Sequence, residues 1–178
     1  GGFYDQDGIA QNSSFRRYNM RANDEVKASN WLKIGTSTMS AYEEVQQAEE
    51  GDMAIYTPIA GSRFMLPYWS PYNKDGSLAS ENNGTWTGTG QNPIEWMANN
   101  PVSYKKYKVL STVFADITPI QNLTVRIQFG ADYSHSTTFM QSFPSYVINN
   151  EQGTAGRNSA DVLKLSETAT ANYRWALN

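Results

Sequence analysis

The sequence predicts an all-β protein of antiparallel strands, and two observations lead to this fold class. Residues Leu123–Ser134 (LTVRIQFGADYS) alternate apolar and polar side chains without exception, which is the period-two pattern of a strand with two unlike faces. The chain is also 13% aromatic and only 17% charged. Such a composition, with many Asn, Ser, Thr and Gly residues, fits β structure with polar loops better than a helical protein.

The length of the alternating stretch bears on whether the strand lies in a soluble protein or in a membrane. Strands of soluble proteins usually contain about five or six residues, whereas a tilted membrane-spanning strand needs about ten. The apolar face of this stretch ends at Tyr133, as expected for the aromatic girdle at a membrane edge. From this stretch alone, a half-buried strand of a soluble sandwich and a membrane-spanning strand are both open interpretations.

Five further segments have the residue pattern of strands: Gly1–Tyr4, Phe15–Lys27, Trp31–Tyr42, Tyr107–Thr118 and Glu167–Leu177. Two tight turns join strands of matched length and therefore predict antiparallel hairpins. One hairpin pairs Ser14–Lys27 with Trp31–Tyr42, and the other pairs Tyr107–Thr118 with Leu123–Ser134.

Two long polar connections, Glu43–Lys106 and Thr137–Leu165, alternate with the tight turns. The first is rich in aromatic residues, which disordered segments lack, so we predict that it is largely ordered. Asn92 followed by Pro93 is a helix start, and it predicts a short helix over Ile94–Asn99.

Long loops at one end and short turns at the other are typical of an outer-membrane barrel. A soluble sandwich has no reason to keep its long loops at one end. The sequence therefore predicts antiparallel up-and-down strands that form a segment of a transmembrane β-barrel, with long extracellular loops containing short helices. The chain opens without Met or a signal peptide and ends within an apparent strand, so we expect a piece of a longer protein.

The residues indicate no enzymatic chemistry, and we expect no catalytic site, no metal site and no cofactor. The chain has no cysteine and one histidine, His135, which lies in a predicted strand end rather than in a recognisable triad. Adjacent carboxylates such as Glu43 and Glu44 point in different directions and are usually solvated. The formal net charge of -3 gives no reason to expect nucleic acid.

An ordered set of motifs resembles the barrel of SusC/RagA-type TonB-dependent outer-membrane transporters of the Bacteroidetes. The set covers nearly the whole chain, and each motif alone is weak. It consists of Asp5-Gln6 with Gly8-Ile9; Phe15, Arg17, Tyr18, Arg21 and Asn23; Trp31 to Gly35; Pro71 to Gly76; Asn92-Pro93; and Leu123-Thr124 with Phe129-Gly130-x-Asp132-Tyr133.

This resemblance implies nutrient import, of oligosaccharides or peptides, across the outer membrane of a Gram-negative bacterium. It implies a barrel of about 22 strands filled by a plug, a SusD-like surface lipoprotein as partner, and energy from the TonB complex acting through the plug region. No plug segment is recognisable here, so residues 1–178 are expected to be a partial barrel, with 43–106 as a long ordered extracellular loop. The alternative is a soluble β-rich glycan-binding module.

Two groups of residues are candidates for binding. Aromatic side chains of the long loop could stack on a solute or pack against a partner, or they could form the loop's own core: Trp69, Tyr72, Trp86 and Trp96. Polar side chains on one face of the strands are expected to face the barrel lumen, because unpaired charges are costly in a dry core: Arg17, Asn19, Arg21, Asn23, Arg126 and Gln128. The opposite face, with Val125, Ile127, Phe129, Tyr173 and Trp175, is expected to face lipid.

Overall fold

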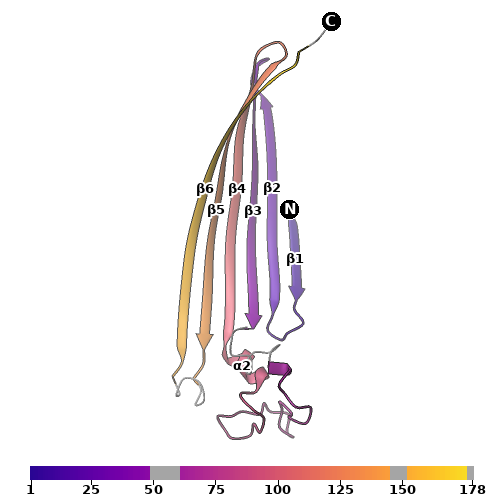
Figure 1. Ribbon diagram of the computed structural model, residues 1–178, viewed down its shortest axis with the longest axis vertical. Coiled ribbons are helices and arrows are strands. Elements are labelled where there is room, and N and C mark those ends of the chain that lie inside the picture. Colours follow the sequence, from indigo (N-terminus) through magenta and orange to yellow (C-terminus); the bar gives the residue numbers. More distant parts are fainter. Residues whose placement is uncertain (49–60, 145–151, 176–178) are drawn as a thin grey trace.

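A computed structural model describes residues 1–48, 61–144 and 152–175 of the chain. Six strands form one antiparallel sheet in the order of the sequence, each paired with its neighbours in the chain (Figure 1). The strands are β1 (Gly2–Asp7), β2 (Ser14–Lys27), β3 (Leu32–Ala48), β4 (Pro101–Ile120), β5 (Leu123–Ser142) and β6 (Thr154–Tyr173). The predicted all-β, up-and-down fold class is therefore confirmed.

Both predicted hairpins are confirmed. Strand β2 pairs with β3 from Ser14↔Gln46 to Lys27↔Lys33, and β4 pairs with β5 over most of their lengths. Their tight turns lie at one end of the sheet, whereas the connections β1–β2, β3–β4 and β5–β6 all lie at the other end (Figure 1). We call this second end the rim.

The strands continue further toward the rim than the sequence indicates. Residues 43–48 and 101–106, predicted as loop, extend β3 and β4, so the connection between them covers residues 49–100. The reason is cross-strand charge pairing, because Glu44 lies opposite Lys105 and Glu43 lies opposite Lys106. We call residues 49–100 the rim loop, of which 61–100 are described.

The predicted second long connection, Thr137–Leu165, is wrong in its bounds. Strand β5 continues to Ser142 and β6 begins at Thr154, where each of the added residues pairs across the β5–β6 ladder. The added segments carry apolar residues on both faces, such as the adjacent pairs Phe139–Met140 and Val162–Leu163, so they show no regular alternation that the sequence could reveal. The predicted end of the last strand at Leu177 lies outside the described residues, and β6 ends at Tyr173.

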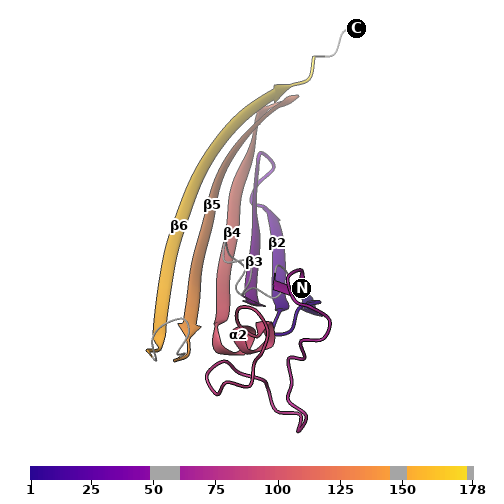
Figure 2. The ribbon, with the colours of Figure 1, turned by 60° about the horizontal axis from the view of Figure 1, so that its bottom comes forward.

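The predicted short helix is confirmed as α2 (Pro93–Asn99). Asn92 is its N-cap and accepts a hydrogen bond from the backbone N–H of Ile94, while Pro93 occupies the first helical position, where no N–H is needed. Helix α2 lies at the rim with the rest of the rim loop (Figure 2). No helix in the described ranges is long and apolar enough to cross a membrane.

The sheet curves along its length as a single layer (Figure 2). Four apolar residues are buried in the described part of the chain, and three of them, Ala79, Trp86 and Met97, belong to the rim loop rather than to the sheet. Large apolar side chains on the strands stay exposed, including Phe129 at 56% and Leu165 at 75%. Residues 1–48, 61–144 and 152–175 therefore do not supply the covering layer that a water-soluble sheet with an apolar face requires.

Candidate functional site

The strand register divides the sheet into two faces. Val125 and Ile127 of β5 lie opposite Ile117 and Ala115 of β4, so the apolar side chains of neighbouring strands share one face. Strand β6 adds Ala169, Ala171 and Tyr173 to the same face. We call this the apolar face and the other the polar face. Trp175, predicted to share the apolar face, follows the end of β6 and is 76% exposed.

All six residues predicted to face a lumen lie on the polar face: Arg17, Asn19, Arg21 and Asn23 of β2, and Arg126 and Gln128 of β5. Arg17 and Arg126 form ion pairs with carboxylates of neighbouring strands, and so does Lys108 on the same face. Arg17 lies 3.6 Å from Glu43, and Lys108 lies 3.1 Å from Asp132. The polar face is thus a polar wall with a net positive charge, because its Lys and Arg residues outnumber its Asp and Glu residues.

Arg126 is the most constrained cation of the polar face. Its guanidinium donates two hydrogen bonds to Asp116, at 2.6 and 2.7 Å, and lies 4.4 Å above the ring of Phe114. The ring in turn covers Gly35 on the next strand, where an added Cβ would lie 2.3 Å from it. Gly35 therefore allows the ring to lie flat and to support the arginine.

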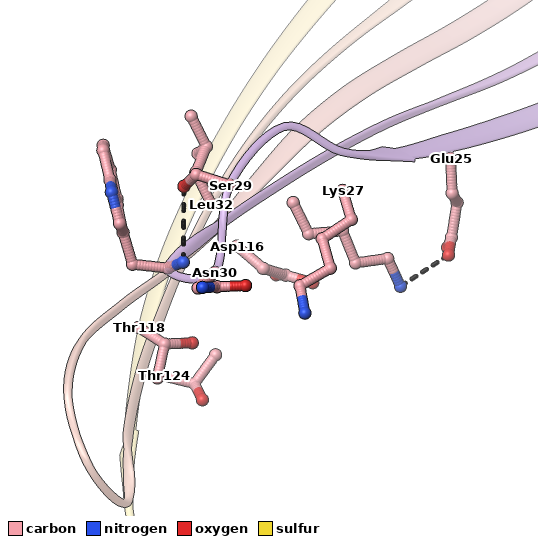
Figure 3. A pocket seen from close by; sticks show the side chains of 10 residues that line it. Glu25, Lys27, Ser29, Asn30, Leu32, Asp116, Thr118 and Thr124 are labelled. Atoms are coloured by element: carbon pink, nitrogen blue, oxygen red, sulfur yellow. Dashed lines mark hydrogen bonds and ion pairs between the residues drawn. The ribbon is translucent and has the colours of Figure 1, made fainter.

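A pocket of about 450 Å³ opens on the polar face at the tight-turn end (Figure 3). It lies beneath the β2–β3 turn, where Ser29 accepts a hydrogen bond from the backbone N–H of Trp31. Lys33 forms an ion pair with Glu25 at 2.5 Å inside it, and Lys27 adds a second ammonium group. The lining can hold water and polar groups, and it offers no arrangement of a nucleophile with a base.

The rim loop is organised around the buried side chain of Asn92, which is 0% exposed. Its amide nitrogen donates to the carbonyl of Pro71 at 2.8 Å and to that of Ala79 at 2.7 Å, while its oxygen caps α2. One side chain thus joins three separate segments of the loop. A further backbone hydrogen bond, from Phe143 to the carbonyl of Asn99, ties the helix end to β5.

The four predicted aromatic candidates do not form one cluster. Trp86 is buried, and its indole N–H donates to the carbonyl of Gly90 at 2.7 Å, so it belongs to the loop's own core. Trp96 lies beside Glu81 and Glu95 in a small cavity against the end of β5. Trp69 packs edge-on against Tyr68, and Tyr72 is 45% exposed. Tyr72 is therefore the exposed member of the four, while Trp69, three residues before it, is half-buried like Trp96.

Two rows of side chains across the apolar face escaped the sequence analysis. The first, which we call the aromatic row, consists of Phe3, Tyr18, Tyr42 and Tyr107, which lie opposite one another on β1 to β4. The second, which we call the charged row, lies beside it on the rim side and consists of Asp5, Arg16, Glu44 and Lys105. The signal that could reveal them is an aromatic residue two positions from a charged one on each strand.

The carboxylate of Glu81 gives the rim loop a pH dependence. Burial and the neighbouring carboxylate of Glu95 raise the pKa of Glu81 above its ordinary 4.5. A raised folded-state pKa stabilises the loop while Glu81 is protonated, and this contribution is lost as the pH rises above 4.5 through the folded pKa. Asp75, whose pKa is lowered by hydrogen bonds from Ser77, acts oppositely but only below 3.8.

We therefore expect residues 61–100 to exchange their amide hydrogens more slowly just below pH 4.5 than near neutrality, after correction for the intrinsic pH dependence of exchange. Glu81→Gln should abolish most of the difference, because the amide does not ionise. Asp75→Asn is the matched control and should leave the difference above pH 4.5 intact. An unchanged pH profile in Glu81→Gln would contradict the assignment.

These observations define a class of structure: a single curved sheet with one apolar and one polar face, strands of up to 20 residues, and its long loops at one end. That is the architecture of a membrane barrel wall. Among such barrels, the resemblance in the sequence predicted part of a TonB-dependent transporter barrel.

The comparisons with known proteins support this assignment. The chain is 27% identical over 180 residues to TonB-dependent receptor P26 of Formosa agariphila, covering 97% of this chain and 17% of that protein. It superimposes on the RagAB peptide importer in the open-open state with a TM-score of 0.79 and 25% identity, and in the closed-closed state with 0.78 and 23%. Each superposition covers 99% of this chain and 20% of the other. No family model matches the chain.

Proposed function

We propose that this chain forms part of the barrel wall of an outer-membrane, TonB-dependent nutrient transporter. The observation that carries the proposal is the division of the sheet into an apolar and a polar face by the strand register. Such a wall separates lipid from an aqueous lumen, because its apolar side chains gain by leaving water and its charges stay hydrated. The chain spans about a fifth or less of the relatives it matches, so transport is proposed for the whole protein.

The soluble glycan-binding module is the second candidate, and the solvent exposure of the side chains on the apolar face argues against it. That reading requires Val125, Ile127 and Phe129 to be covered by a second layer, as in a sandwich core. Phe129 and Tyr173 are 56% and 57% exposed, and nothing in the described ranges packs over them. A bilayer supplies the missing apolar surroundings.

The solute and the partners follow from the resemblance and from the relatives. Matched structures are described as a peptide importer, so peptides are the first solute class to test and oligosaccharides the second. A SusD-like lipoprotein would sit at the rim, which carries the long loops, and the TonB complex would act on a plug region. Trp69 and Tyr72 of the rim loop are the side chains we propose for solute or lipoprotein contact.

The test is uptake by cells. A strain that lacks the full-length gene should lose uptake of labelled peptides or oligosaccharides, and the intact gene should restore it. Trp69→Ala/Tyr72→Ala should lower uptake about tenfold, because each aromatic contact contributes roughly 0.5–1.5 kcal/mol. Ile9→Ala, which changes another exposed apolar residue at the rim, is the control. Unchanged uptake in the deletion strain would refute transport, whereas an unchanged double variant would refute only the loop contact.

A further inference from the structure

Charged side chains of the polar face gather at three successive levels of the sheet, between the rim and the middle of the strands. A level is a set of residues that lie opposite one another on neighbouring strands, and these levels pass through Arg17, Asn19 and Arg21 of β2. We call their charged residues the cationic band: Arg17, Arg21, Glu43, Lys106, Lys108, Asp132 and Lys164. The band holds five cations and two carboxylates, whereas the next level, through Asn23, has no charged residue on β2 to β6.

Both carboxylates of the band are engaged by its own cations. Glu43 lies 3.6 Å from Arg17, and Asp132 lies 3.1 Å from Lys108. The other three cations form no ion pair with any residue in the described ranges: Arg21, Lys106 and Lys164. The band therefore carries an excess of positive charge that the described part of the chain does not neutralise.

The three unmatched cations lie on alternate strands, Arg21 on β2, Lys106 on β4 and Lys164 on β6. Neighbouring strands are about 4.8 Å apart, so these alternate strands are separated by about 10 Å. A solute with several separate carboxylates fits this spacing better than a single phosphate does. Arg21 is exposed and donates from Nε to the amide oxygen of Asn23 at 3.3 Å, which leaves its two terminal nitrogens for a ligand.

The cationic band would lie along the path from the rim into the barrel if the polar face lines the lumen, as the proposed function requires. The apolar face and the bilayer behind it would form a low-dielectric wall, which focuses the field of the band into the lumen. Hydrogen bonds from Lys and Arg to carboxylates are stronger than those between neutral groups. An acidic solute therefore gains more from this wall than a neutral solute of the same size.

We propose that the cationic band binds carboxylate groups of the transported solute and makes the transporter selective for acidic solutes over neutral ones. The inference rests on the proposed function, because it requires the solute to reach the polar face. Acidic peptides and oligosaccharides that contain uronic acids present the same carboxylate chemistry. The experiment distinguishes these two sources.

The test measures solute binding to the purified full-length transporter, with pairs of solutes of equal length that differ only in charge. One pair is a glutamate-rich peptide and its glutamine counterpart, and the other is an oligosaccharide with and without uronic acids. The wild type should bind the acidic member of at least one pair more tightly, and added salt should reduce this preference. The pair that shows the preference identifies the source of the carboxylates. Arg21→Gln/Lys106→Gln should lower the preference on the order of tenfold and leave the affinity for the neutral member unchanged.

Arg16→Gln/Lys105→Gln is the matched control, because it removes the same charge from the adjacent residues of the same strands, which lie on the apolar face. It should leave the preference unchanged, and heat-modifiable migration shows that each variant is folded. Equal wild-type affinity within both pairs, or an unchanged preference in Arg21→Gln/Lys106→Gln, would overturn the inference. Failure of the proposed function would appear separately, as unchanged uptake of every solute in a strain that lacks the gene.

Discussion

Ile127→Arg should prevent most of the full-length protein from assembling as a folded barrel. Ile127 lies on the apolar face between Ala115 of β4 and Ala169 of β6, so no neighbouring carboxylate is directly opposite it. An arginine on the lipid face near the bilayer midplane costs roughly 2–4 kcal/mol. Loss of the isoleucine side chain, which the bilayer would cover, adds about 1.5–3 kcal/mol. Together these terms are comparable with a large fraction of the stability of a protein domain.

The amount of heat-modifiable, folded barrel in isolated outer membranes measures this effect. Gln128→Arg is the matched control, because it moves the same charge by one residue and thereby to the polar face, between Phe114 and Thr168. It should assemble at close to the wild-type level. Equal assembly of both variants, or the reverse order, would refute the lipid-facing assignment and favour the soluble module.

Asn92→Ala should unfold residues 61–100 of the rim loop while the strands remain paired. The substitution removes the donor to the carbonyl of Ala79, leaves the carbonyl of Pro71 with the backbone N–H of Ala79 alone, and removes the cap of α2. An unsatisfied buried polar group costs about 1–3 kcal/mol, and a lost cap about 1 kcal/mol. The sum exceeds what the small core of Ala79, Trp86 and Met97 can offset. Limited proteolysis of intact cells should then cut within residues 61–100.

Asn92→Asp separates the two roles of this side chain. Aspartate retains the oxygen that caps α2 but cannot donate to the carbonyls of Pro71 and Ala79. We expect proteases to cut Asn92→Asp almost as readily as Asn92→Ala, because the two donated hydrogen bonds contribute more to the loop than the helix cap. Asn83→Ala, at a turn of the same loop where the side chain accepts from Thr85, should change proteolysis only slightly. Full protection in Asn92→Asp would show that capping alone holds the loop.

The sequence was sufficient for the central parts of the strands, for both hairpins and for the helix start at Asn92, because each of these depends on local pattern or turn chemistry. The rim ends of β5 and β6 could not be predicted, since adjacent apolar residues such as Phe139 and Met140 lie on opposite faces and interrupt the alternation. Neither could the charged row, because the pairing of Glu44 with Lys105 depends on a register set across the rim loop. No tight turn sets the register across a connection of this length, so turn chemistry cannot predict it.

Some features of the candidate site could likewise be predicted from the sequence, and others could not. The common face of Arg17, Arg21 and Arg126 followed from alternation, whereas the burial of Trp86 depends on a close approach to Gly88, where an added Cβ would lie 2.3 Å from the ring. The cap at Asn92 was recognisable from its neighbour Pro93. Its contacts with Pro71 and Ala79 were not, because they join segments more than ten residues apart.

Strand β6 pairs with β5 along one edge, and no described strand pairs with its other edge. In water, the free N–H and C=O groups of such an edge are hydrated, but it is also a template for another chain. In lipid, each unpaired group would cost several kcal/mol. Within a membrane barrel, this edge must therefore find its neighbouring strand before or during insertion. The backbone of β6, rather than any side chain, therefore requires this edge to be paired with another strand no later than its entry into the bilayer.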